Sequence, residues 1–133
     1  MNGKRMRGVY TVEFAIIGLL LFVLLFGVLE MGRLLFTVNA LDEVVRRGAR
    51  LATVCTIDNP DILKRAIFNE ISEGDSSSLI HALETADLTL IYLDGDGALV
   101  PNPGSSGFSS VRFVQISVVD FPFTLLIPGL GGE

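Results

Sequence analysis

One acidic residue adjoins the longest apolar stretch of the sequence. Glu13 is followed directly by the unbroken run from Phe14 to Leu29, FAIIGLLLFVLLFGVL. A carboxylate within a membrane-spanning helix costs about 2.5–3.5 kcal/mol on insertion scales, so it normally marks a partner or a function. Two interpretations stay open: Glu13 needs a positively charged partner, or it lies at the wet headgroup boundary, where it favours the helix N-terminus.

A candidate for the positive partner lies just upstream. Gly8 separates a basic octapeptide from the apolar run, at a point where a peptidase can cut after it. Cleavage there makes Val9 the new N-terminal residue, whose α-amine, with a pKa near ~8, is mostly protonated at neutral pH. Because Glu13 follows Val9 by four residues, the amine and the carboxylate share one face of a helix. Within one chain, or between neighbouring chains, this amine supplies the charge that Glu13 lacks.

The apolar run is long enough to cross a membrane. From Val9 to Leu29 there are 21 residues, which as an α-helix extend about 32 Å, against about 30 Å for a hydrocarbon core. Lys4, Arg5 and Arg7 precede it without an acidic residue, so the positive-inside rule keeps residues 1–8 in the cytoplasm. We therefore expect a single-pass protein of the bacterial cytoplasmic (inner) membrane, in contact with lipid, whose C-terminal domain is extracytoplasmic.

The pattern of a basic leader, a glycine and a glutamate resembles the class III signal of type IV pilins. The segment RGVYTVEFA from Arg7 to Ala15, the later RGAR, and VRFVQISV near the end are similar to TadE-like minor pseudopilins of the tight-adherence (Tad/Flp) pilus system. Two positions depart from that family. Ile17-Gly18 stands where the family often has proline, and Arg47 stands where it often has glutamate before Gly-Ala-Arg.

The resemblance implies a function. A prepilin peptidase would cut between Gly8 and Val9, and Glu13 would pair its charge during assembly. The implied partners are other minor pseudopilins, the major Flp pilin and the inner-membrane assembly platform. The chain would initiate, cap or support a pilus used in adhesion. The segment implied to pack the helix contains Phe14, Ala15, Gly48, Ala49 and Arg50.

Composition limits the other function classes. Ten Lys and Arg against fifteen Asp and Glu give a net charge of −5, which argues against a nucleic-acid-binding protein. A single cysteine, Cys55, and a single histidine, His81, exclude an internal disulfide and a Cys/His zinc site. The exported part lacks titratable residues clustered at catalytic spacing, so we expect neither an enzyme nor a cofactor or metal.

The long helix is expected to continue beyond the membrane. No proline occurs before Pro60, so nothing forces the helix to stop at the membrane surface. An apolar stripe with helical spacing extends it to about Ala52. This stripe contains Leu34, Val38, Leu41, Val45, Gly48 or Ala49, and Ala52. The chain divides into a leader (1–8), a helix (9–52, of which 9–29 is transmembrane) and an extracytoplasmic domain (53–133).

That domain is expected to be α+β and pilin-like. Asp58-Asn59-Pro60-Asp61 predicts a helix start, with the helix reaching about Glu73, and Ser76-Ser77-Ser78 predicts a shorter helix to about Thr85. Residues 87–93 and 111–121 predict an antiparallel strand pair packed on the outer half of the long helix. Asp94-Gly95-Asp96-Gly97 predicts a turn rather than a calcium loop, because further ligands are missing. The apolar segment from Phe121 to Leu130 either folds back on the helix or offers a surface to a partner.

Two alternatives to a pilin remain. The chain can be an unprocessed single-pass anchor that carries a binding module of the cell envelope. A secretory signal with a soluble domain would need a small-x-small cleavage site after Leu29, which Glu30-Met31-Gly32-Arg33 does not provide.

Overall fold

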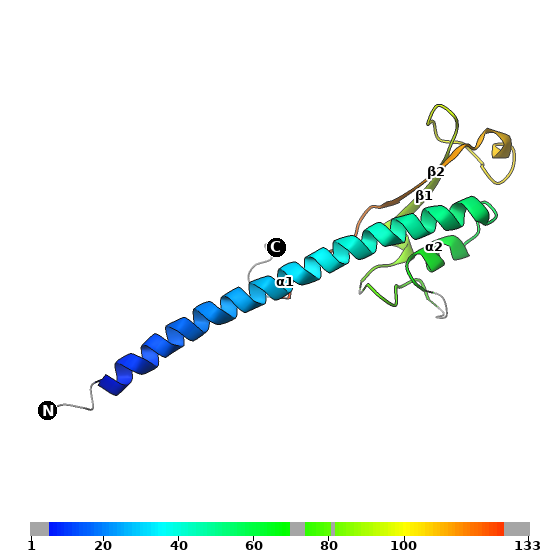
Figure 1. Cartoon of the computed structure of the whole chain (residues 1–133). Helices are drawn as coiled ribbons and strands as arrows, with labels where there is room; N and C mark the ends of the chain where they lie inside the picture. The colour runs from blue at the N-terminus through cyan, green and yellow to red at the C-terminus, as the bar shows by residue number, and fades with distance from the viewer. Residues whose placement is uncertain (1–5, 70–73, 81, 127–133) are drawn as a thin grey trace. The chain divides into compact units, whose positions relative to one another are not determined.

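The fold is α+β, as predicted. The computed structural model describes residues 6–69, 74–80 and 82–126. In chain order these residues form helix α1 (Met6–Val54), helix α2 (Asp61–Ala66), the 3₁₀ turn η1 (Thr85–Asp87), strand β1 (Leu88–Leu93), the 3₁₀ turn η2 (Phe108–Ser110) and strand β2 (Phe113–Val118) (Figure 1). The expected long N-terminal helix and antiparallel strand pair are both confirmed.

The described residues form two compact units. One contains α1 as far as Phe36 together with the chain from Thr124 onward, and the other is Thr37–Phe123. The last turns of α1 therefore belong to the same unit as the strands. This second unit holds the hydrophobic core.

Small residues on α1 bring the helix close to the sheet of the second unit. Ala40, Val44, Gly48 and Ala52 are buried there. A Cβ atom placed on Gly48 would lie 2.7 Å from Cδ1 of Ile116 and 3.1 Å from Cβ of Ala66. The helix can approach this closely only because the residue at that position has no side chain.

Gly48 and Ala52 of the predicted apolar stripe are buried as expected, but the first half of the stripe is displaced by about one residue around the helix. Leu34 and Val38 are exposed, and Leu41 and Val45 pack only at the edge of the core. The prediction weighted large apolar residues, whereas the closest packing selects small ones. The core cluster consists of Ala40, Val44, Ala66, Ile67, Ile80, Leu83, Leu88 and Ile116.

The sheet has two antiparallel strands. Its register runs from Leu88 opposite Val118 to Leu93 opposite Phe113. β2 is shorter than the predicted strand over 111–121, because Val111 directly follows η2 and the pairing stops at Val118. The Asp94 carboxylate accepts hydrogen bonds from the backbone N–H groups of Asp96 and Ala98, both at 2.9 Å. Asp94–Gly97 is thus a turn closed by its own side chain, as predicted.

The helix predicted to reach Glu73 is shorter. The side chain of Asn59 accepts the backbone N–H of Asp61 at the expected start, but α2 ends at Ala66. Phe68 then adopts a positive φ of 62°, and the N–H of Asn69 returns to the carbonyl of Lys64. The guanidinium of Arg47 lies 5.0 Å from the centre of the Phe68 ring, and this contact holds the turn against α1. Residues 70–73 lie outside the described residues.

The helix predicted from Ser76 to Thr85 is not formed in residues 76–80 and 82–85. The Ser77 hydroxyl accepts the N–H groups of Leu79 and Ile80, which is the expected cap, but Ser76 then bridges to Glu84. A positive φ at Ala82 turns the chain back instead of extending a helix. His81 lies outside the described residues.

Candidate functional site: an apolar helix with one carboxylate

The first turns of α1 carry the residues that were predicted to be processed. The helix begins at Met6, so Gly8 and Val9 already have helical backbone geometry. Both are exposed, and no heavy atom lies within 4 Å of the place where a Cβ of Gly8 would be. Lys4 and Arg5 lie outside the described residues. No other part of the described chain therefore covers Gly8.

Glu13 lies one turn after Val9 on the same face of α1. Its side chain is exposed, and within the described residues no ion pair joins it to another group. Phe14 and Ala15, which follow it, are also exposed, Phe14 by 78%. The carboxylate is therefore available to a positive group that approaches from outside the helix.

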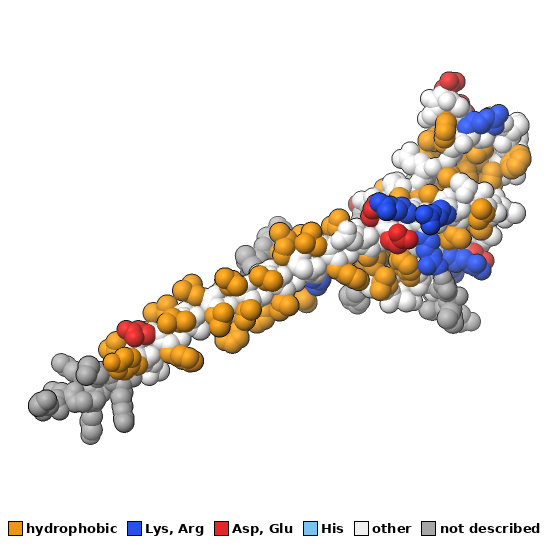
Figure 2. Space-filling view, in the orientation of Figure 1, with side chains coloured by type: hydrophobic (Ala, Val, Ile, Leu, Met, Phe, Trp, Pro, Cys, Tyr) orange, Lys and Arg blue, Asp and Glu red, His pale blue; other side chains and the backbone are white. Residues whose placement is uncertain are grey.

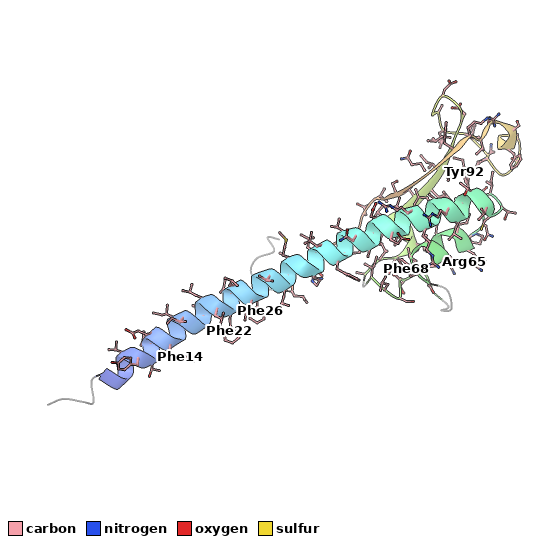
Figure 3. The ribbon with its side chains drawn as sticks, in the orientation of Figure 1. Phe14, Phe22, Phe26, Arg65, Phe68 and Tyr92 are labelled. Atoms are coloured by element: carbon pink, nitrogen blue, oxygen red, sulfur yellow. The ribbon has the colours of Figure 1, made fainter. Side chains whose placement is uncertain are left out.

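The apolar residues around Glu13 are exposed in the chain by itself. Every large hydrophobic residue from Val9 to Leu29 has an accessible side chain, and Phe14, Phe22 and Phe26 project from the helix (Figure 3). Apolar side chains cover the visible face of this part of α1 (Figure 2). A surface of this size is stable only when lipid or another protein covers it. Among the described residues, α1 is the one helix with the length and composition of a membrane span.

The Gly48-Ala49-Arg50 segment lies at the other end of α1. Gly48 is buried against Ile116 and Ala66, Ala49 is partly buried and Arg50 is exposed. On the exposed side of this part of α1, Asp42 and Arg46 form an i,i+4 ion pair with 2.8 Å between the carboxylate and the guanidinium. Gly48 therefore acts within the second unit, and the structure does not bring it together with Glu13.

A cavity in the second unit was not predicted from the sequence. It has a volume of about 330 Å³. Its walls include Cys55, Tyr92, Phe108, Arg112 and Val114. Such a volume is within the range of small-ligand pockets.

Tyr92 is one of the polar residues that line this cavity. The residue is only 5% exposed, and its hydroxyl has no hydrogen-bond partner among the described residues. Burial raises the pKa of the Tyr92 hydroxyl, while the nearby Asp58 backbone lowers it by a smaller amount. The sequence placed Tyr92 in a strand but gave no sign of an empty space beside it. Alternation along the strand puts it on the buried face with Leu88.

Comparison with protein families singles out α1. The model of the TadE-like protein family matches residues 8–50. Over this segment the chain is similar to TadE-like proteins. No match was found among curated proteins or among solved structures.

The TadE-like segment begins at Gly8 and ends at Arg50, so it lies entirely within α1. The match agrees with the resemblance found in the sequence. It covers all the predicted site residues, which are Gly8, Val9, Glu13, Phe14, Ala15, Gly48, Ala49 and Arg50. The cavity and the strands lie almost wholly outside it.

Proposed function

We propose that this TadE-like protein is a non-enzymatic minor pilin. A prepilin peptidase removes residues 1–8, and the mature chain joins a Tad/Flp pilus through α1, where it initiates, caps or supports the fibre used in adhesion. One observation supports this most: a single exposed carboxylate, Glu13, interrupts the apolar surface four residues after Val9, inside the family-matched segment.

The chemistry of assembly follows from that spacing. Before cleavage, the basic leader holds the N-terminus in the cytoplasm, because Lys4, Arg5 and Arg7 resist transfer across the membrane. After cleavage, the Val9 amine is charged and lies one turn from Glu13. In the low dielectric between packed apolar helices, an unpaired carboxylate is strongly unfavourable. An incoming subunit is therefore stabilised only in the register that brings its amine to a carboxylate.

The partners follow from the same proposal. The exposed apolar surface of α1 is covered by lipid of the inner membrane before assembly and by the helices of other minor pseudopilins and the major Flp pilin afterwards. The assembly platform of the inner membrane extracts the subunit. The second unit is extracytoplasmic on this proposal.

A second function is favoured by the cavity at Tyr92. An unprocessed chain, anchored by α1, can present this cavity as a binding module in the cell envelope. Such a protein retains residues 1–8 and has no use for the charge of Glu13. The two proposals therefore differ in the fate of the leader.

Substitution of Gly8 tests the proposal. Gly8→Val places a branched side chain beside the scissile bond, and we expect full-length protein to accumulate in the membrane. Gly8→Ala is the matched control, since a methyl group is small enough for continued cleavage. The exposure of Gly8 means that neither change disturbs packing. Complete cleavage of Gly8→Val, measured by the mass of the membrane-extracted chain, would contradict processing at this bond.

A further inference from the structure

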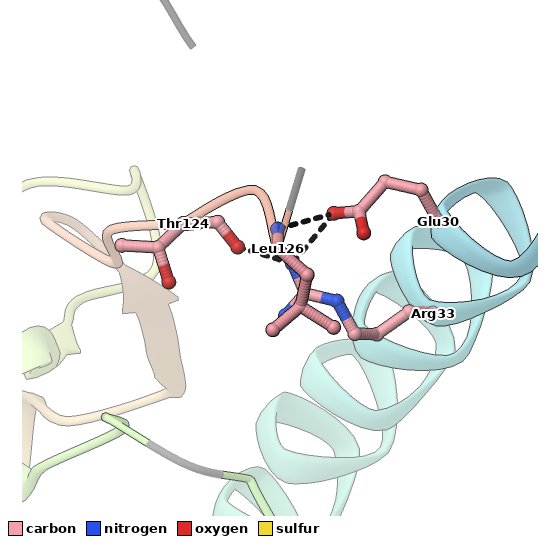
Figure 4. A network of polar contacts seen from close by, with 4 residues as sticks. All are labelled: Glu30, Arg33, Thr124 and Leu126. Carbon is pink, nitrogen blue, oxygen red and sulfur yellow. Dashed lines mark hydrogen bonds and ion pairs between the residues drawn. The ribbon is translucent and has the colours of Figure 1, made fainter. Parts of the chain in front are cut away.

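After the strands, residues 124–126 lie against α1, where two charged side chains form hydrogen bonds with them. Glu30 and Arg33 form an ion pair with 2.7 Å between the carboxylate and the guanidinium. The same guanidinium donates a hydrogen bond to the carbonyl of Thr124. The carboxylate of Glu30 accepts the N–H of Leu126 at 3.4 Å (Figure 4). Residues 124–126 therefore belong to the same compact unit as the apolar part of α1.

The position of Glu30 along α1 fixes the depth of this contact. Glu30 is the residue directly after the span from Val9 to Leu29, whose length of about 32 Å matches the hydrocarbon core. Charged side chains at the end of a span lie at the lipid–water boundary. Because Thr124 and Leu126 bond to Glu30 and Arg33, they lie at the same boundary.

The segment has the chemistry of an interfacial contact. Residues 121–126 read Phe-Pro-Phe-Thr-Leu-Leu and carry no charge. The side chain of Leu126 is 73% exposed and that of Leu125 is 40% exposed. Two backbone groups that lipid could not satisfy, the carbonyl of Thr124 and the N–H of Leu126, are bonded by Arg33 and Glu30. These two backbone groups are thus bonded to α1, while the side chains of Leu125 and Leu126 stay exposed.

We infer that Leu125 and Leu126 form a second membrane contact, inserted into the outer interface of the lipid bilayer. The partner is lipid rather than protein because Leu126 is bonded to Glu30, the residue directly after the apolar span. The chain would then be held to the membrane at two places, by the span and by residues 124–126. This inference rests on the membrane span of α1 and is independent of cleavage at Gly8.

Tryptophan fluorescence provides the test, because the sequence contains no tryptophan. Full-length Leu126→Trp would be reconstituted in vesicles of phosphatidylcholine and phosphatidylglycerol, with phosphatidylcholine brominated near the headgroup or near the chain end as the quencher. We expect blue-shifted emission, little quenching by acrylamide, and a larger loss of emission with bromine near the headgroup. Leu99→Trp, at a leucine that is 64% exposed in the second unit, is the matched control. Phe14→Trp marks the hydrocarbon region.

Two fluorescence results would contradict a lipid contact of Leu126. Emission of Leu126→Trp that matches Leu99→Trp, with strong acrylamide quenching and none by brominated lipid, would overturn the inference. Protection from both quenchers would also overturn it, because protein rather than lipid would then cover the site. An unchanged circular dichroism spectrum verifies that each variant is folded. The vesicles contain no peptidase and no other pilin, so failure of the proposed pilin function leaves this result unaffected.

Discussion

At the scale of single residues, two polar groups in apolar surroundings carry the account. Glu13 is exposed on a helix whose neighbouring side chains are apolar, and Tyr92 is buried without a hydrogen-bond partner among the described residues. Natural proteins rarely keep such groups without a use or a partner. Each therefore gives a direct prediction.

Removal of the Glu13 charge should favour insertion of the chain into the membrane and weaken its incorporation into the pilus. Glu13→Leu is expected to insert more favourably, by about 2.5–3.5 kcal/mol, and still to be cleaved after Gly8. A hydrogen bond to a charged group contributes about 1.5–3 kcal/mol, and each 1.4 kcal/mol is a factor of ten. Recovery of the subunit in sheared pili should therefore fall about tenfold or more. Glu13→Gln, which keeps the size but not the charge, should behave in the same way, and normal recovery of either variant would show that the charge is dispensable.

For Tyr92, the expected effect depends on pH. The folded-state pKa is raised by burial, so stability is fully present below the unfolded pKa of about 10 and is lost as pH rises through the folded value. Tyr92→Phe removes this alkaline loss. At pH 7 the same change should alter the free energy of unfolding by about 1 kcal/mol or less, because the hydroxyl loses at most its contact with the backbone of Asp58. Thermal unfolding of both proteins in detergent between pH 7 and alkaline pH tests this, and parallel pH profiles would contradict it.

At the scale of elements, the C-terminal part of α1 packs closely on the sheet at Gly48, which has no side chain. The contact at Gly48 could not be predicted in detail, since the sequence shows which residues are small but not which side of a helix meets the sheet. The large apolar residues Leu34 and Val38 therefore misplaced the first half of the predicted stripe, whereas Gly48 and Ala52 were placed correctly. The helix itself was predictable, because no proline interrupts it, and so were the strands, rich in β-branched residues. The early end of α2 is followed by the positive φ of Phe68 and by the contact between Phe68 and Arg47, two residues far apart in the sequence.

The close approach of Gly48 to Ile116 predicts that substitutions at these two positions affect stability in a coupled way. Gly48→Val should destabilise the second unit by about 1–3 kcal/mol or more, because its side chain would overlap Ile116 and Ala66. Ile116→Val removes the Cδ1 atom that lies nearest, so the double variant should recover part of the loss, with a coupling of at least about 0.5 kcal/mol. Gly32→Val, with no atom within 4 Å, is the control. Additive changes in thermal unfolding would contradict the close approach.

At the scale of the whole molecule, function divides between the two units. The unit that contains the first part of α1 presents an exposed apolar surface, and the TadE-like match begins in this unit at Gly8 and continues into the second unit as far as Arg50. The second unit holds the core and the cavity. The sequence predicted the site residues of α1 because they are local in the chain. It could not predict the bonds of Glu30 and Arg33 to residues 124–126, which join positions more than 90 residues apart.

The central claim is that the Val9 amine exists in the mature protein and is the counter-charge of Glu13. N-terminal sequencing of the chain extracted from membranes of pilus-producing cells measures this directly. The account predicts a sequence that begins Val-Tyr-Thr-Val-Glu, with residues 1–8 absent. A chain that still begins with Met1 in those cells would contradict it and would favour the membrane-anchored binding module.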